Sequence, residues 1–129
     1  MGPAVKVRGV LFRLARSRLA GFLVRWVFRS MSFLIPVERL RETPSLLAFH
    51  HPQPSYPLHI LIVPRRGYRS LLDLDPGDTE FQRDLVETVQ SLVRDFHLEA
   101  SGYRLLTNGG SYQDVQVLHY HLISEQKIA

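Results

Sequence analysis

The stretch "QDVQVLHYHLIS", residues 113–124, reads as a β-strand that carries two histidines two residues apart. Because side chains alternate across a strand, we expect Val117, His119 and His121 on the same face of the sheet. At about 3.3 Å of rise per residue, the two imidazoles should lie roughly 7 Å apart along the strand. Three interpretations are open: polar residues satisfied by backbone groups, ligands of a zinc site completed by His59, or an imidazole nucleophile that attacks phosphorus. The spacing by itself does not separate them.

The composition is that of an ordinary globular domain. The chain has 129 residues, of which 45% are hydrophobic and 22% are charged, and this is enough for one compact core. It contains no cysteine, which excludes disulfides and thiolate ligands and is compatible with a reducing cytoplasm. We therefore expect a cytoplasmic protein, with peripheral attachment to a membrane as an open alternative.

Positive charge is concentrated at the N-terminal end. Residues 1–37 hold seven of the sixteen Lys and Arg residues and none of the twelve acidic ones. The pattern over residues 9–34 predicts a helix with an apolar face and basic flanks, which would pack on the domain or a partner subunit, or lie on an anionic membrane surface. Its longest charge-free run, Ser30–Val37, is well short of the ~20 apolar residues of a membrane span. We therefore separate a basic amphipathic helical extension, residues 1–34, from a domain over residues 35–129.

The domain is predicted to contain short strands and one long helix. Five strands are expected, over residues 37–41, 45–50, 58–64, 102–108 and 115–123. The segment over residues 75–98 predicts a helix with one apolar stripe, and Asp75 or Asp78 can cap its N-terminus. His97 near its C-terminal end is explained by the helix dipole alone. This order favours an α+β fold, with an antiparallel sheet and the long helix on one side.

Several segments occur in an order and at a spacing that resemble a known family. These segments are "IP" at 35–36, "LLAFHHPQPSYPLHILIVPRR" at 46–66, "GYRLLTNGG" at 102–110 and the strand at 113–124. Together they resemble the histidine-triad (HIT) family of nucleotide hydrolases and transferases. The resemblance implies a HIT-like five-stranded sheet and nucleotidyl transfer, in which the middle histidine of the signature attacks an α-phosphate. By position this nucleophile is His119, and His121 is the third histidine.

The resemblance also assigns the remaining site residues. It implies that His59 joins the catalytic histidines and that Asn108 and Gln113 approach the phosphates or the ribose. An apolar pocket for the base would draw on four residues: Trp26, Val27, Phe49 and Leu61. Packing in the core explains Phe49 and Leu61 equally well. The implied reaction requires no cofactor and no metal.

Three positions depart from the family pattern. The first histidine of the signature is Val117, so the cluster lacks one polar side chain. The acid that usually grips the ribose hydroxyls is His51, and one imidazole cannot accept two hydroxyl hydrogen bonds as a carboxylate can. The Ser or Thr after the glutamine is Asp114, whose carboxylate would repel a phosphate. The alternative to an enzyme is therefore a weakly active or inactive nucleotide- or phosphate-binding module, attached by the N-terminal helix to a membrane or partner.

The expected partners follow from the same features. They are a nucleotide or nucleotide-conjugate substrate and a second copy of the chain, since family members commonly pair through the long helix and an adjoining strand. An anionic membrane surface is a further candidate through residues 1–34. Nucleic acid is the less favoured partner, because the segment is rich in aromatic residues and holds only one lysine.

Overall fold

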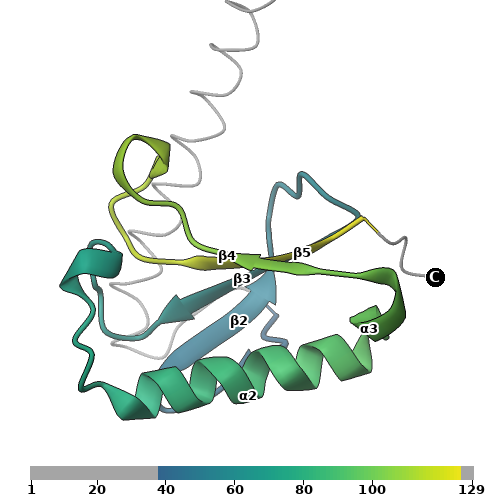
Figure 1. Cartoon of the computed structure of the whole chain (residues 1–129), viewed down its shortest axis with the longest axis horizontal. Coiled ribbons are helices and arrows are strands. Elements are labelled where there is room, and N and C mark those ends of the chain that lie inside the picture. The colour runs from purple at the N-terminus through teal and green to yellow at the C-terminus, as the bar shows by residue number, and fades with distance from the viewer. Residues whose placement is uncertain (1–37, 126–129) are drawn as a thin grey trace, which may run out of the picture.

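The computed structural model describes residues 38–125, and the sheet it contains has five antiparallel strands in the order β1-β2-β3-β5-β4. The strands are β1 (Arg41–Glu42), β2 (Leu46–His50), β3 (Leu58–Pro64), β4 (Arg104–Leu106) and β5 (Tyr120–Ser124). Figure 1 shows the long helix α2 (Thr79–Asp95) lying across one face of the sheet. The predicted α+β fold is therefore confirmed. The helix expected within residues 1–34, with Trp26 and Val27, lies outside the described residues.

Helix α2 begins where the sequence offers a cap and ends earlier than expected. The carboxylate of Asp78 accepts a hydrogen bond from the Phe81 backbone N–H, so of the two candidates the cap is Asp78. The helix ends at Asp95 rather than near residue 98, because His97 adopts a left-handed conformation with φ of 55°. A short helix α3 (Leu98–Ser101) then leads into β4. Two 3₁₀ turns that the sequence did not predict, η1 (Leu71–Asp73) and η2 (Gly110–Tyr112), lie in the loops.

The main core lies between α2 and the sheet. The apolar stripe predicted for α2 is buried at Phe81, Val89, Leu92 and Val93, while Leu85 and Phe96 are partly buried against the same core. The sheet meets this stripe with alternate residues of its three longest strands, as the period of two requires. These sheet residues are Leu46, Ala48, Leu58, Ile60, Ile62, Tyr120 and Leu122.

The strand register sets which side chains share the other face. Across the sheet Phe49 pairs with Leu61, Leu61 with His121, and His121 with Leu106. His59, two residues before Leu61 on β3, pairs with Ile123. Because paired residues point to the same side of a sheet, this register gathers His59 and His121 on the face opposite α2.

Four predicted strands have different bounds in the structure, although the second differs only by beginning at Leu46 instead of residue 45. The first is Arg41–Glu42 rather than 37–41, and the fourth is Arg104–Leu106 rather than 102–108. The last begins at Tyr120 rather than at residue 115, because the chain bends at residues 115–117. The bend is held against a neighbouring loop, where the Leu118 N–H donates to the Tyr68 carbonyl at 2.7 Å. Val117 and His119 therefore precede the strand, and simple alternation does not govern their directions.

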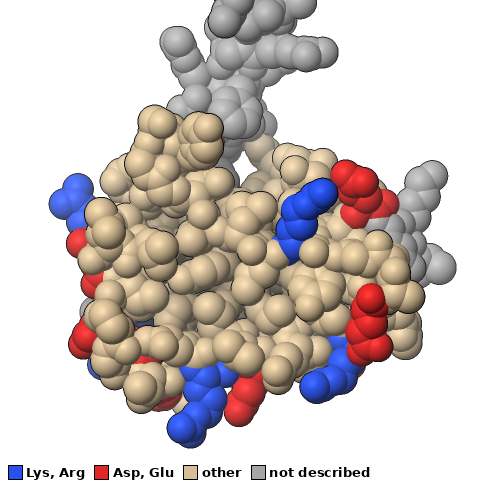
Figure 2. Space-filling model, viewed as in Figure 1, with Lys and Arg blue, Asp and Glu red and all other residues tan. Residues whose placement is uncertain are grey.

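The charge distribution distinguishes the helix from the sheet edge. On the face drawn in Figure 2, charged side chains lie mainly over α2 and around the rim, and few lie over β4 and β5. Within residues 38–125, no helix has both the length and the apolar character needed to cross a membrane.

Candidate functional site

Two strands and the loops beside them bring four histidines together. We call His51, His59, His119 and His121 the histidine cluster: His51 follows β2, His59 is on β3, His119 precedes β5 and His121 is on β5. The ring centroids are 4.3 Å apart for His51 and His59, 5.1 Å for His59 and His121, and 4.9 Å for His119 and His121. The last value is shorter than the spacing of roughly 7 Å expected from a regular strand. The shorter distance follows from the bend before β5, because His119 does not belong to the regular strand.

His119 is oriented by a backbone carbonyl. Its Nδ1 lies 2.7 Å from the carbonyl oxygen of Val117, and its side chain is buried, with 7% exposed. A carbonyl oxygen only accepts hydrogen bonds, so the proton of the neutral ring is on Nδ1 and the electron pair of Nε2 is unshared. The contact uses the backbone of Val117, so the valine side chain at this position does not remove it.

His121 and His59 are joined directly. His59 Nε2 lies 2.8 Å from His121 Nδ1, and both rings are buried, with 6% and 9% exposed. The other nitrogen of His121, Nε2, has no hydrogen-bond partner, and it is the one buried side-chain N or O atom of residues 38–125 in that state. A buried donor without a partner costs free energy, and such atoms concentrate at functional sites. A ligand oxygen is the natural partner for this atom.

Burial keeps the cluster neutral near pH 7. It is the main reason why the pKa of His121 falls to about 3 and the pKa of His59 and of His51 to about 4, and the neighbouring imidazoles add to it. Burial also lowers the pKa of His119, but the Val117 carbonyl and the carboxylate of Asp114 oppose it. His119 is therefore neutral at pH 7, which is the form in which an imidazole acts as a nucleophile.

The remaining sequence-predicted residues divide into those beside the cluster and those turned elsewhere. Phe49 and Leu61 are buried in the same cross-strand row as His121. Asn108 is half-buried two residues beyond β4. The amide of Gln113 donates to the carbonyls of Arg69 at 2.6 Å and Val115 at 3.0 Å, so in this structure it braces the loop.

Several contacts that hold the cluster carried no signal in the sequence, because at least one partner in each contact is a backbone atom. The N–H of Ser55 donates to His59 Nδ1 at 3.1 Å, and the N–H of Gln53 donates to His51 Nδ1 at 2.9 Å. The hydroxyl of Thr107 donates to the carbonyl of His119 at 2.7 Å. The three prolines among residues 52–57 were the available hint, since they mark a stiff loop next to two of the histidines.

The histidine cluster does not have the geometry of a metal site. No group of three or more His, Asp or Glu side chains within the described residues is placed to hold a metal ion. The contact between His59 Nε2 and His121 Nδ1 explains this, because each of these nitrogen atoms already has the other as its partner. The zinc interpretation of His59, His119 and His121 therefore has no support from the structure.

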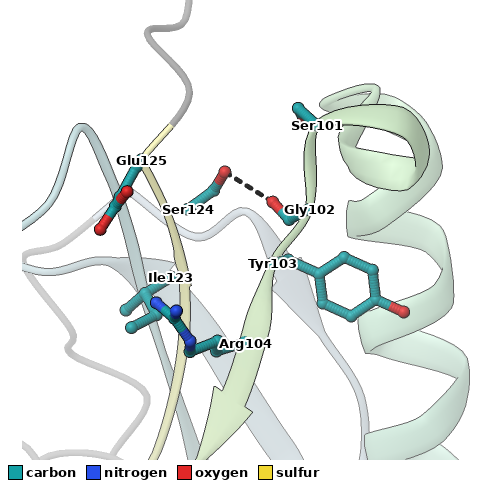
Figure 3. Close-up of a pocket in the computed structure, with 7 residues that line it drawn as sticks. All are labelled: Ser101, Gly102, Tyr103, Arg104, Ile123, Ser124 and Glu125. Atoms are coloured by element: carbon teal, nitrogen blue, oxygen red, sulfur yellow. Dashed lines mark hydrogen bonds between the residues drawn. The ribbon is translucent and has the colours of Figure 1, made fainter.

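A shallow pocket lies at another place, between the start of β4 and the end of β5 (Figure 3). It is lined by residues 101–104 and 123–125, and it contains no histidine. Within it the hydroxyl of Ser124 donates to the carbonyl of Gly102 at 2.8 Å. This pocket lies between β4 and β5 and is separate in composition from the histidine cluster.

Comparison with known proteins gives one consistent result. The sequence model of the HIT domain family matches residues 33–128. An uncharacterised HIT-like protein of Azospirillum brasilense is 33% identical over 97 residues, which cover 73% of this chain and 80% of that protein. The structure of a HIT family hydrolase from Legionella pneumophila is similar with a TM-score of 0.69 and 26% identity, covering 81% of this chain and 94% of that one. A histidine triad protein from Clostridium difficile has a TM-score of 0.67 and 28% identity, covering 78% and 90%. The family match includes all four histidines of the cluster.

Proposed function

Because the chain belongs to the HIT domain family, we propose that it hydrolyses or transfers the nucleotidyl group of a nucleotide phosphoester, phosphoanhydride or phosphoramidate. The observation that carries the proposal is the 2.7 Å contact between His119 Nδ1 and the Val117 carbonyl, which leaves the Nε2 electron pair unshared. A neutral imidazole held in this way attacks phosphorus near pH 7. The similar protein of Legionella pneumophila, which is called a HIT family hydrolase, supports the reaction class.

The first step moves the nucleotidyl group onto the protein. The Nε2 electron pair of His119 attacks the α-phosphorus, an N–P bond forms, and the bond between phosphorus and the leaving group breaks. The leaving group departs with that electron pair and takes up a proton from solvent. The neighbouring neutral His121, whose ring centroid is 4.9 Å from that of His119, stabilises a phosphate or leaving-group atom by a hydrogen bond from its unpartnered Nε2. His59 supports the donor through its contact with His121 Nδ1.

The second step releases the nucleotide. A water oxygen attacks the phosphorus, the N–P bond breaks, and its electron pair returns to His119. The water loses its proton to solvent, so that one water molecule is consumed in each turnover. An alcohol or amine acceptor in place of water gives transfer instead of hydrolysis. No cofactor enters either step.

Substrate contacts are assigned in the proposal to the residues that the family resemblance identifies. Phe49 and Leu61 offer apolar surface for a base, and in the proposal Trp26 and Val27 complete it. Polar contacts to the phosphates or sugar are assigned to His51, Asn108 and Gln113. Gln113 would exchange at least one of its two backbone partners to reach a substrate.

The test is turnover of adenosine phosphoramidates and dinucleoside polyphosphates. We expect the wild-type protein to release nucleoside monophosphate, and an alkaline quench to trap a phosphorus adduct on His119. His119→Ala should lower kcat/KM by about 10³-fold or more, because it removes the nucleophile. His50→Ala is the matched control, since His50 is exposed and its ring meets Phe96 on the α2 side of the sheet. Undiminished turnover by His119→Ala would refute His119 as the nucleophile.

A nucleotide-binding module with little turnover is the second candidate. It is favoured by Asp114, whose carboxylate acts on the pKa of His119 and would repel a phosphate there. It is also favoured by His51, which replaces a carboxylate in the family pattern. Binding of nucleotides by the wild-type protein without any turnover of the substrate panel would establish this candidate and exclude the enzyme.

We also propose a homodimer joined along β4, together with α2. β4 ends the strand order of the described sheet, and two large hydrophobic residues are exposed there, Tyr103 (46%) and Leu105 (40%). Such an edge is a template for pairing with a second chain. Sedimentation velocity at micromolar concentration should detect a dimer that Leu105→Arg weakens, and a monomeric wild-type protein would contradict the proposal.

For residues 1–34 we propose peripheral attachment of a cytoplasmic protein to an anionic membrane. The support is their composition, with seven basic and no acidic residues among many apolar ones. Co-sedimentation with anionic liposomes should depend on this segment and weaken with salt. Equal binding by a protein that starts at residue 35 would exclude it. Nucleic acid is the less favoured anionic partner.

A further inference from the structure

The proline-containing loop between β2 and β3 supplies two backbone donors to the histidine cluster. The N–H of Gln53 donates to His51 Nδ1 at 2.9 Å, and the N–H of Ser55 donates to His59 Nδ1 at 3.1 Å. The loop is also closed at its base, where the N–H of His51 donates to the carbonyl of His59 at 2.8 Å. The loop thus orients the imidazoles of His51 and His59, one at each of its ends.

We propose that these backbone amides are positioning groups that fix the tautomers of the cluster. This inference rests on the proposed function for its catalytic meaning, but its structural content is independent of it. A ring nitrogen that accepts a hydrogen bond carries no proton, so Nδ1 of both His51 and His59 is unprotonated. The proton of each neutral ring is therefore on Nε2.

The hydrogen bond from the Ser55 N–H also fixes the tautomer of His121, through His59. His59 Nε2–H faces His121 Nδ1 at 2.8 Å and donates to it. His121 Nδ1 is then the acceptor, and the proton of His121 is on Nε2, the buried atom that has no partner. A single backbone N–H thus determines that His121 presents a donor to the site.

His119 is the opposite tautomer, because its backbone partner is a hydrogen-bond acceptor and not a donor. The Val117 carbonyl takes the Nδ1–H of His119, so its Nε2 is a bare electron pair. Two neighbouring rings, 4.9 Å apart, therefore offer one electron pair and one N–H. This combination suits attack on phosphorus by one ring and stabilisation of a phosphate oxygen or leaving group by the other.

The spacing of the prolines suits the loop to this task. Pro52, Pro54 and Pro57 have no N–H and a fixed φ, so they stiffen the loop without adding competing donors. Gln53 and Ser55 stand between them and carry the two N–H groups that are used. The donors are therefore held in place before any substrate arrives, at little further loss of conformational entropy.

The direct test is nitrogen NMR of the wild-type chain with ¹⁵N-labelled histidine at pH 7.5. Long-range proton–nitrogen correlations distinguish a protonated ring nitrogen from a bare one. We expect Nε2–H for His51, His59 and His121, and Nδ1–H for His119 as the internal control. A protonated Nδ1 on His59 or on His121 would overturn the proposal.

A pair of variants tests the source of the effect. Ser55→Pro removes the N–H, whereas Ser55→Ala keeps it and removes only the hydroxyl. We expect Ser55→Pro to give mixed tautomers at His59 and His121 and to lower kcat by about tenfold or more, with Ser55→Ala matching the wild type in both measurements. Unchanged tautomers in a folded Ser55→Pro variant would refute the role of Ser55.

The outcomes separate this inference from the proposed function. The predicted tautomers in a wild-type protein without turnover would leave the inference standing and exclude the enzyme. Turnover by a wild-type protein with the other tautomer at His59 would do the reverse. If Ser55→Pro does not fold, the wild-type spectrum still decides between the tautomers.

Discussion

At the scale of single residues, Val117 and His51 show that a replaced side chain has different consequences at different positions. Val117 still orients His119, because the contact comes from its carbonyl oxygen. His51 contributes through its ring, and the Gln53 N–H already occupies its Nδ1. Its remaining polar atom is therefore a donor, where a carboxylate would be an acceptor. The replacement at position 117 therefore leaves the orientation of the proposed nucleophile unchanged, whereas the replacement at position 51 bears on the proposed contacts with substrate.

We therefore expect His51→Asp to change sugar selectivity. A carboxylate accepts hydrogen bonds from both hydroxyls of a ribose, and hydrogen bonds to charged groups are worth about 1.5–3 kcal/mol. The ratio of kcat/KM for an adenosine phosphoramidate over its 2′-deoxy analogue should rise by about tenfold relative to wild type. His50→Asp adds the same charge on the α2 side and should leave the ratio unchanged. A ratio that does not rise in His51→Asp would refute contact between this position and the sugar.

At the scale of elements, α2 is connected to the segment that carries His119, the proposed nucleophile. Asp78 caps α2 with one carboxylate oxygen and accepts from the Tyr68 hydroxyl at 2.6 Å with the other. The hydrogen bond from Tyr68 is the main reason why the pKa of Asp78 is lowered. The Tyr68 carbonyl in turn accepts from the Leu118 N–H, next to His119. Hydrogen bonds therefore link the N-cap residue Asp78 to Tyr68, and Tyr68 to the segment that precedes β5.

Asp78→Ala should consequently destabilise the domain by about 1–2 kcal/mol. The substitution removes the N-cap of α2, and it also leaves the Tyr68 hydroxyl without this acceptor. The free energy of unfolding in urea at pH 7 measures the effect. Asp75→Ala is the matched control: among the described residues its carboxylate accepts only from the Gly77 N–H, within the preceding turn and at 2.8 Å, and its loss should cost less. An equal cost for the two variants would contradict the assignment of the cap.

At the scale of the whole molecule, the buried histidines couple stability to pH. In the unfolded chain a histidine has a pKa of about 6.5. In the folded protein, burial lowers the pKa of His51 and His59 to about 4 and that of His121 to about 3. Between these values the unfolded chain binds more protons than the folded one, so stability rises with pH across that window. Stability is therefore lost as pH falls from about 6.5 toward 4.

We expect the Tm to fall by about 5 °C or more between pH 7 and pH 4.5. His59→Gln removes one of the responsible rings and should make the fall shallower. Thermal unfolding followed by circular dichroism at several pH values provides the comparison, and a Tm that is level across the range would contradict the coupling.

The sequence by itself determined the order of the five strands and the long helix α2, and the face of that helix that is buried. These features follow from local periodicity, since a stripe such as Phe81, Val89 and Leu92 reports burial wherever the helix packs. The family resemblance likewise depends on short segments that can be read directly. The last strand was wrong in its extent, because the Leu118 N–H bonds to Tyr68, fifty residues earlier in the chain; alternation cannot report such a contact.

Only the tertiary structure decided how the histidines meet. His59 and His121 are 62 residues apart, and the 2.8 Å contact between them depends on the register of β3 against β5. The tautomers depend on the Ser55 N–H and the Val117 carbonyl. These are backbone groups, and residue identities alone do not show which side chains they contact. The sequence therefore identifies the imidazoles, while long-range pairing and backbone hydrogen bonds decide which of their nitrogens carry protons.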